Sequence, residues 1–177
     1  MPSPLIHLAV AAAAARIAPL PDAPRPRLRL FAVSAVASML PDVDAAAGLL
    51  ASVSPQTLSL VHNQGTHSLL FLVLAAPLLA LLARPFLRPL RYRAVLSLVA
   101  ALLASHLLLD YFTWGRGLLL FWPLSSTRYA SPVPLFYGVR YSLGLRTPAH
   151  LLTLATELLT LALLSLPVFL WCRRHHS

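Results

Sequence analysis

The sequence predicts an all-α fold, a polytopic membrane helix bundle of about five helices, and three observations support this prediction. Hydrophobic residues make up 58% of the chain and charged residues 11%, whereas an ordinary soluble domain carries roughly 25% charged residues. The apolar residues form long runs that short polar connections separate. The basic residues, all of them arginine, gather in those connections, as they do in membrane proteins. We expect residues 1–177 to form a single membrane-embedded domain.

Other broad classes of protein fit the composition poorly. A formal net charge of +9 could indicate a nucleic-acid partner, but the arginines flank apolar runs instead of lining one polar face, so we expect no nucleic acid. The apolar excess excludes a disordered chain. The single cysteine, Cys172, has no second cysteine in the chain with which to form a disulfide.

Five apolar segments are the predicted helices, and they cover about residues 5–17, 28–40, 67–83, 94–112 and 151–171. A helix that spans a membrane needs about 20 residues, with about 17 as the usual minimum. The last two segments reach this length, the third is marginal, and the first two are short. The short segments either span a thinned or protein-lined region or are partly re-entrant. We expect the first segment to be a retained helix, because no basic residue precedes it as in a signal peptide.

Three of the four connections between the predicted helices have a distinctive composition. Residues 20–27 and 84–91 are basic and contain several prolines, which predicts that neither connection is helical. Residues 113–148 form a long loop between the fourth and fifth helices, and they include the aromatic residues Trp114, Trp122, Tyr129, Tyr137 and Tyr141. Such residues favour the headgroup level of a bilayer. We therefore expect an interfacial loop that lies on the membrane.

The arginines also predict an orientation. If all five segments cross the membrane, one side receives Arg16, Arg25, Arg27, Arg29, Arg84, Arg88, Arg91, Arg93, Arg173 and Arg174, and the other receives Arg116, Arg128, Arg140 and Arg146. Short connections rich in arginine stay in the cytoplasm. The N-terminus is then outside the cytoplasm, and the C-terminus is cytoplasmic.

Seven ionisable residues lie within or beside the apolar segments: His7, Asp42, Asp44, His62, His67, His106 and Asp110. An ionisable side chain at membrane depth costs at least about 2.5 kcal/mol and persists mainly where it has a partner and a function. In the predicted topology all seven lie on the side away from the arginine clusters. Taken alone, each has a simpler explanation, such as a turn followed by a helix cap at Asp42 and Asp44. Their common location instead predicts one site.

The chemistry of these seven residues predicts a metal site. His106 and Asp110 are four residues apart on a helix, so both side chains project from one face and can reach one ion. Imidazole and carboxylate ligands suit zinc, manganese or iron, and we expect a divalent metal, zinc in the first place. Seven ligands exceed the three or four of a single zinc site, which indicates two ions.

Two ions about 3.5–4 Å apart are the usual arrangement for phosphoester hydrolysis. One ion would lower the pKa of a bound water, and the other would polarise the phosphoryl oxygen. Asp42 or Asp44 would then be catalytic, either by bridging the metals or by acting as general base.

The other buried or terminal ionisable residues are weaker candidates. Glu157 lies in the second turn of the fifth segment on the same side. It either adds a ligand, or supports a ligand histidine from behind, or packs between helices. We expect His150 to be interfacial, and His175 and His176 to belong to a basic cytoplasmic tail.

Four motifs carry a resemblance to a known family. They are the early His7, the Pro-Asp-x-Asp of residues 41–44, the His-x4-His-Ser of residues 62–68, and the His-x3-Asp of residues 106–110 with the glycines and apolar run that follow as far as Pro123. On these motifs, most of the chain resembles the YdjM-like (LexA-binding) inner-membrane metal-dependent hydrolase family. That family is distantly similar to zinc-dependent phospholipases C and single-strand nucleases, which are helical and use clustered metals. The resemblance implies hydrolase activity, a phosphoester substrate and a location in the bacterial inner membrane.

Two positions depart from the family's pattern. Asn63 stands where an arginine that contacts an anion is usual, so Arg116 or Arg128 of the long loop would have to take that role. Ala11 stands where a glycine is common. Neither change removes a predicted ligand.

The leading hypothesis is a membrane-bound metal-dependent hydrolase that acts on a phosphoester, with a lipid headgroup as the candidate substrate. A transporter or channel for a divalent ion would need polar residues that continue toward the cytoplasmic end, and the third and fourth segments have almost none there. A non-catalytic membrane scaffold or regulator with a structural metal site also agrees with the sequence. Such a protein would bind its partner at the cytoplasmic arginine turns.

Overall fold

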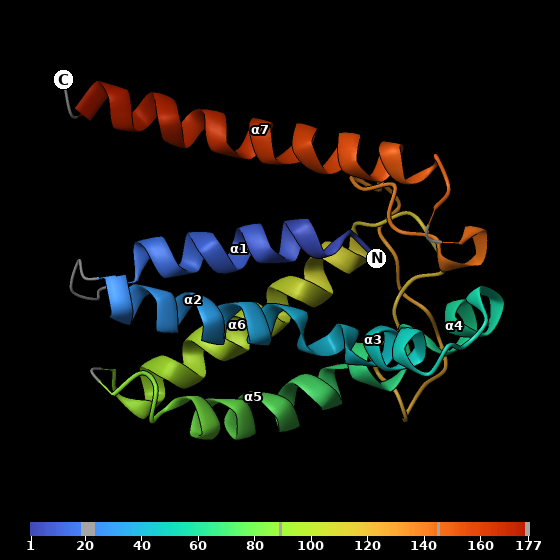
Figure 1. Cartoon of the computed structure of the whole chain (residues 1–177), viewed down its shortest axis with the longest axis horizontal. Coiled ribbons are helices and arrows are strands. Elements are labelled where there is room, and N and C mark those ends of the chain that lie inside the picture. Colours follow the sequence, from blue (N-terminus) through green and yellow to red (C-terminus); the bar gives the residue numbers. More distant parts are fainter. Residues whose placement is uncertain (19–23, 89, 145, 176–177) are drawn as a thin grey trace.

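The computed structural model describes residues 1–18, 24–88, 90–144 and 146–175, with side chains of the last helix described as far as Leu163. Helices and irregular loops make up this part of the chain, apart from two isolated β-bridges (Figure 1). The α-helices are α1 (Pro4–Ile17), α2 (Pro24–Met39), α3 (Val43–Leu50), α4 (Pro55–Val61), α5 (Leu69–Ala83), α6 (Tyr92–Tyr111) and α7 (His150–His175). Three short 3-10 turns are η1 (Leu40–Asp42), η2 (Gly65–His67) and η3 (Tyr141–Leu143). This architecture confirms the predicted all-α bundle, and α1, α2, α5, α6 and α7 correspond to the five predicted helices.

Two boundaries differ from the prediction. The connection over residues 20–27 is not irregular throughout, because α2 begins at Pro24 and includes Pro26. Prolines are tolerated in the first turn of a helix, where the backbone N–H has no intrahelical partner. The second segment is also longer than predicted, because η1 joins α2 to α3 and the helical path runs from Pro24 to Leu50. Residues 19–23 lie outside the described residues.

Two helical stretches in the described part of the chain are long and apolar enough to span a membrane: Pro24–Leu50, with 27 residues, and Tyr92–Tyr111, with 20 residues. The helices Pro4–Ile17, Leu69–Ala83 and, within α7, His150–Leu163 are apolar but shorter. Of these shorter helices, α1 packs against α2 and α5 packs against α6.

Small residues allow the helices to pack closely. Ala11 of α1, Ala37 of α2 and Ala80 of α5 are completely buried, with Val95 and Val99 of α6 beside them in the core. Small side chains at helix contacts are typical of membrane bundles, in which close approach of the backbones supplies the packing energy. Many of the large apolar residues point outward instead, as Leu74, Leu78 and Leu81 of α5 do. This outward apolar surface suits a lipid environment.

The last helix, α7, stands apart from the other long helices and runs alongside them (Figure 1). Its first turns attach it to the rest of the fold. The Thr153 hydroxyl donates to the Gly138 carbonyl at 2.8 Å, and the Glu157 carboxylate accepts hydrogen bonds from the backbone N–H and the hydroxyl of Ser3. Ser3 caps the N-terminus of α1. Glu157 therefore joins α7 to the start of the first helix.

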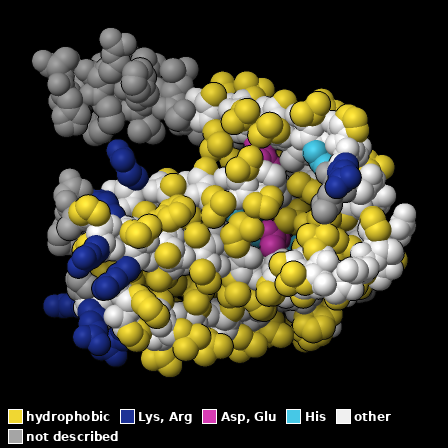
Figure 2. Space-filling model, viewed as in Figure 1, with side chains coloured by type: hydrophobic (Ala, Val, Ile, Leu, Met, Phe, Trp, Pro, Cys, Tyr) yellow, Lys and Arg dark blue, Asp and Glu magenta, His cyan; other side chains and the backbone are white. Residues whose placement is uncertain are grey.

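The two ends of the bundle differ in charge. Most of the arginine side chains gather at the end that holds the α1–α2 and α5–α6 connections, and hydrophobic side chains cover the middle (Figure 2). At the opposite end the loop of residues 113–148 folds over the helices, with the backbone of Leu118 paired to that of Tyr129 and the Trp114 N–H donating to the Phe136 carbonyl at 2.9 Å. The predicted site residues lie at this loop-covered end.

Candidate metal centre

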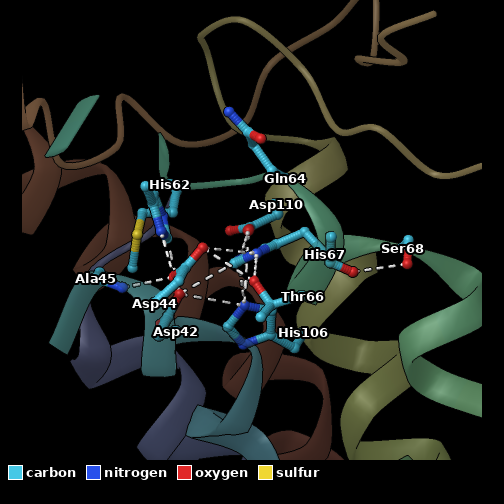
Figure 3. A network of polar contacts seen from close by, with 12 residues as sticks. Asp42, Asp44, Ala45, His62, Gln64, Thr66, His67, Ser68, His106 and Asp110 are labelled. Carbon is cyan, nitrogen blue, oxygen red and sulfur yellow. Dashed lines mark hydrogen bonds and ion pairs between the residues drawn. The ribbon is translucent and has the colours of Figure 1, made fainter. Parts of the chain in front are cut away.

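Six different elements bring the seven predicted site residues to one place. His7 lies on α1, Asp42 ends η1, Asp44 lies on α3, His62 follows α4, His67 ends η2, and His106 and Asp110 lie one turn apart on α6. Figure 3 shows six of these side chains converging, whereas the neighbouring Gln64 points away from them. Residues separated by as much as a hundred positions therefore meet at one end of the bundle.

Four atoms form the centre of the cluster. The Nε2 atom of His67 lies 3.4 Å from Oδ1 of Asp42 and 3.3 Å from Oδ2 of Asp110. The Nε2 atom of His106 lies 3.5 Å and 3.6 Å from the same two oxygens. The two Nε2 atoms are 3.2 Å apart. We call Asp42, His67, His106 and Asp110 the central quartet.

Hydrogen bonds on the far side of each ring orient the histidines. The Nδ1 atom of His106 lies 2.7 Å from the Ser38 carbonyl, which can only accept. The Nδ1 atom of His62 lies 2.7 Å from Asp44, and that of His67 lies 3.0 Å from the Thr66 hydroxyl, which itself donates to Asp44. A proton on Nδ1 leaves Nε2 with a free lone pair. Outer partners of this kind hold histidines for metal binding in many proteins.

Six buried side-chain atoms of the cluster lack hydrogen-bond partners, whereas the Nε2 atoms of His67 and His106 lie within hydrogen-bond distance of each other. Both carboxylate oxygens of Asp42 and of Asp110 are buried without a partner, and so are the Nε2 atoms of His7 and His62. Burying an unpaired carboxylate is costly unless a cation compensates it. The donor set and its orphaned atoms fit a divalent metal ion.

The electrostatics of the cluster also favour a cation. Burial alone would lower the pKa of His67, but the nearby carboxylates of Asp110 and Asp42 outweigh burial and raise that pKa to about 9. Without a metal, His67 therefore carries a proton at neutral pH. The two carboxylates thus favour a positive charge at His67, and a bound metal ion would supply such a charge instead.

The flanking histidines extend the cluster on two sides. The His7 ring stacks on that of His106, with centroids 4.0 Å apart, and His7 forms a possible metal-binding group with His106 and Asp110. Asp42, His67 and His106 form a second such group, and Asp44, His62 and His67 a third, with the ligand atoms of each group within 4.8 Å of one another. The groups share His67 and His106, so the cluster could hold more than one ion.

A family model for the YdjM inner membrane protein matches residues 1–175. The chain belongs to this family. The match confirms the resemblance stated from the sequence, and it identifies the chain as an inner membrane protein. No curated protein and no solved structure matches the chain.

In this YdjM family member, Asp44, Glu157 and His150 lie outside the central quartet. The two acids of the proline turn face different atoms: Asp42 faces the Nε2 atoms, and Asp44 contacts the outer side of His62 and the Thr66 hydroxyl. Glu157 is 1% exposed and contacts Ser3 instead of a histidine. His150 is outside the cluster, with its Nε2 atom 3.0 Å from the Gly144 carbonyl.

Sequence reasoning missed three partners of the cluster. Thr66 links Asp44 to His67, and its position directly before a histidine was an available signal. The sequence could not indicate that the Ser38 carbonyl contacts His106, because every residue has a backbone carbonyl. The Tyr141 ring packs edge-on against that of His62, with centroids 5.4 Å apart. Burial, with the three nearby aspartates adding to it, raises the pKa of Tyr141, so the phenol stays protonated.

Proposed function

We propose that this protein is a metal-dependent hydrolase that cleaves a phosphoester at the membrane surface. The observation that carries the proposal is the central quartet, in which buried carboxylate oxygens without hydrogen-bond partners face the Nε2 atoms of two histidines at 3.3 to 3.6 Å. Family membership supports the proposal through the resemblance of the four motifs.

Zinc is the proposed ion at the quartet. Zinc bonds to imidazole nitrogen and carboxylate oxygen are about 2.0–2.2 Å long, so ligand atoms at the corners of a tetrahedron lie about 3.4 Å apart. The five distances measured within the quartet run from 3.2 to 3.6 Å. These spacings are close to those around a zinc ion, and Asp42, His67 and His106 form one possible metal-binding group.

The remaining residues would have separate roles. His7, beside His106 and Asp110, or His62, beside Asp44 and His67, would contribute a free Nε2 atom to a second ion with fewer protein ligands and an open position. When bound, such ions activate water and polarise the phosphoryl group. Asp42 lies near both His62 and His67 and is the proposed bridging or proton-accepting carboxylate. Asp44 would orient His62 directly and His67 through Thr66.

A non-catalytic scaffold or regulator is the second candidate, because the quartet by itself is a closed set of four protein ligands. Closed four-ligand zinc sites are usually structural. The number of ions separates the two functions. One ion per chain with four protein ligands and no turnover of a phosphoester would favour the scaffold.

We also propose that the metal site faces away from the cytoplasm. The arginine-rich connections lie at the opposite end of the bundle, and such connections stay in the cytoplasm. Reporter fusions near Ser59 and near Arg88 test this orientation, with the cytoplasmic signal expected only from the second. Cytoplasmic exposure of both points would contradict it.

Metal analysis of the detergent-purified protein tests the proposed function. We expect stoichiometric zinc in the unmodified protein, little in His106→Ala and Asp110→Ala, and an unchanged amount in His150→Ala, which removes a histidine outside the cluster. Release of nitrophenol from a nitrophenyl phosphodiester should follow the zinc content. Unmodified protein that binds no stoichiometric metal would defeat the proposal.

A further inference from the structure

A cavity of about 470 Å³ borders the metal cluster. His62 and Tyr141 form the wall nearest the cluster, and Asn63, Trp114, Arg116 and Arg140 line the rest with several apolar residues. The cavity thus lies between the loop of residues 113–148 and the segment that carries His62. A molecule held in this cavity would therefore lie beside His62.

Two arginines hold positive charge at this cavity. The Arg116 guanidinium donates to the backbone carbonyls of Ser59 and His62. The Arg140 guanidinium lies 4.7 Å from the ring centroids of both Trp114 and Tyr137. Carbonyls and aromatic faces hold a guanidinium in place without neutralising its charge.

No carboxylate pairs with either guanidinium in the described part of the chain. Its described acids are committed elsewhere: Asp42, Asp44 and Asp110 lie in the metal cluster, and Glu157 contacts Ser3. Arg128, the other arginine suggested by the sequence, donates to the Gly117 carbonyl at 3.0 Å and does not line the cavity. Arg116 and Arg140 therefore leave the cavity with two uncompensated positive charges.

We propose that this cavity binds the phosphate group of an ester, with Arg116 and Arg140 as the anion-binding residues. Guanidinium groups match the oxygens of a phosphate with paired hydrogen bonds, and prior ordering of both groups reduces the entropy lost on binding. Leu60 and Val139 give the same cavity apolar surface for the rest of an ester. The inference deepens the proposed hydrolase function by naming where its substrate binds.

Phosphate binding to the purified protein tests the proposal. Inorganic phosphate is titrated calorimetrically into zinc-treated protein in dodecyl maltoside, after removal of unbound zinc. In a second arm the titrant is phosphatidic acid in the same detergent. The variants are Arg116→Gln and Arg140→Gln, and Arg146→Gln is the matched control, because it makes the same charge change at an exposed position of the same loop. Zinc content is measured for every variant.

We expect Arg116→Gln and Arg140→Gln each to weaken binding about tenfold or more, as the loss of a charged hydrogen-bond partner does. Zinc content and the Arg146→Gln variant should stay at the level of the unmodified protein. Arginine-dependent binding of phosphatidic acid alone identifies a lipid source, and equal dependence for both titrants identifies any accessible phosphate. Unchanged binding in both cavity variants, or no binding to the unmodified protein, overturns the proposal.

The test distinguishes this inference from the proposed function. Should the protein bind no zinc, the hydrolase proposal fails, while the arginine dependence of phosphate binding is still measured on the same samples. If Arg116→Gln disturbs the backbone of His62 and reduces zinc content, Arg140→Gln decides the result, since the Arg140 guanidinium lies over the rings of Trp114 and Tyr137 and outside the cluster.

Discussion

The two ends of the helical bundle carry their charge in opposite ways. At the end that holds the candidate metal site, which we call the metal end, the residues of the central quartet are at most 5% exposed and their side chains face one another. At the arginine end, Arg84, Arg88, Arg91 and Arg93 are exposed, and Arg27 donates to the carbonyls of Ala15 and Arg16 in the last turn of α1.

The difference shows which charges determine topology and which determine chemistry. An exposed guanidinium stays hydrated, so it costs little free energy, and a count of such groups predicts orientation. A buried carboxylate loses its hydration, which costs several kcal/mol unless a cation or hydrogen bonds replace it. The buried carboxylates of the metal end are therefore expected to have a function, because burial without a cation would cost free energy.

The largest expected effect is at the quartet. Asp110→Asn keeps the shape of the side chain but removes its charge, so we expect zinc affinity to fall more than about 100-fold, beyond the loss typical of an outer partner. The metal-free variant should unfold at a lower temperature than the metal-free parent, because it removes a carboxylate that pairs with the protonated His67. Chelator competition and thermal unfolding measure the two effects. Retained zinc affinity would show that Asp110 is not a zinc ligand.

The next effect concerns the outer partners of the histidines. Asp44→Asn weakens the hold on His62 and Thr66 but leaves the quartet intact, so we expect zinc affinity to fall about 10–100-fold. Saturating zinc should restore full stoichiometry. Gln64→Ala is the control, since Gln64 bonds to the Leu60 carbonyl away from the cluster. A stoichiometry that stays low in excess zinc would instead make Asp44 a ligand.

A smaller effect is expected at the contact between α7 and α1. Glu157→Gln replaces a charged acceptor of the Ser3 hydrogen bonds with a neutral amide, which should lower the free energy of unfolding by about 1 kcal/mol. Zinc content should not change. Thr160→Ala serves as the control, because the Thr160 hydroxyl bonds to the Thr156 carbonyl of its own helix. Loss of zinc from Glu157→Gln would contradict this role and support Glu157 as a ligand.

The smallest effect is expected at the arginine end. Arg88 is exposed, so Arg88→Gln should change the free energy of unfolding by no more than about 0.5 kcal/mol and leave zinc content unaltered. Denaturation in detergent and metal analysis provide the measurements. A loss of zinc comparable with that of Asp110→Asn would show that the two ends are coupled, which the comparison excludes.

Much of the fold follows from patterns that the sequence displays. Apolar runs marked the five long helices to within a few residues, because an apolar run of that length in a membrane can satisfy its backbone only as a helix. The short helices α3 and α4 were missed. Their stability depends on contact with each other, where Leu58 is 1% exposed and packs so closely on Gly48 that a Cβ atom there would lie 2.6 Å from it. Ser54 and Pro55 are a helix-start signal, but the helix that follows them has only seven residues.

The candidate site divides in the same way. Three features of the sequence predicted a cluster at one end of the bundle. They are the residue types, the four-residue spacing of His106 and Asp110, and the common membrane side of the seven residues. They could not separate Asp42 from Asp44, which are two residues apart in one turn. The path of η1 into α3 aims the first at the Nε2 atoms and the second at the outer side of His62.

By itself the sequence determined that this protein lies in a membrane, its five long helices, the end of the bundle that carries each kind of charge, and its family. Those properties depend on composition and on spacing along one chain, which are local. Only the tertiary structure decided which ring nitrogen faces inward, which carboxylate lies behind a histidine, and that Arg140 rests on Trp114 and Tyr137 beside the cavity. The reason is physical: these relations join atoms from distant helices and loops, and their distances exist only after the helices have packed.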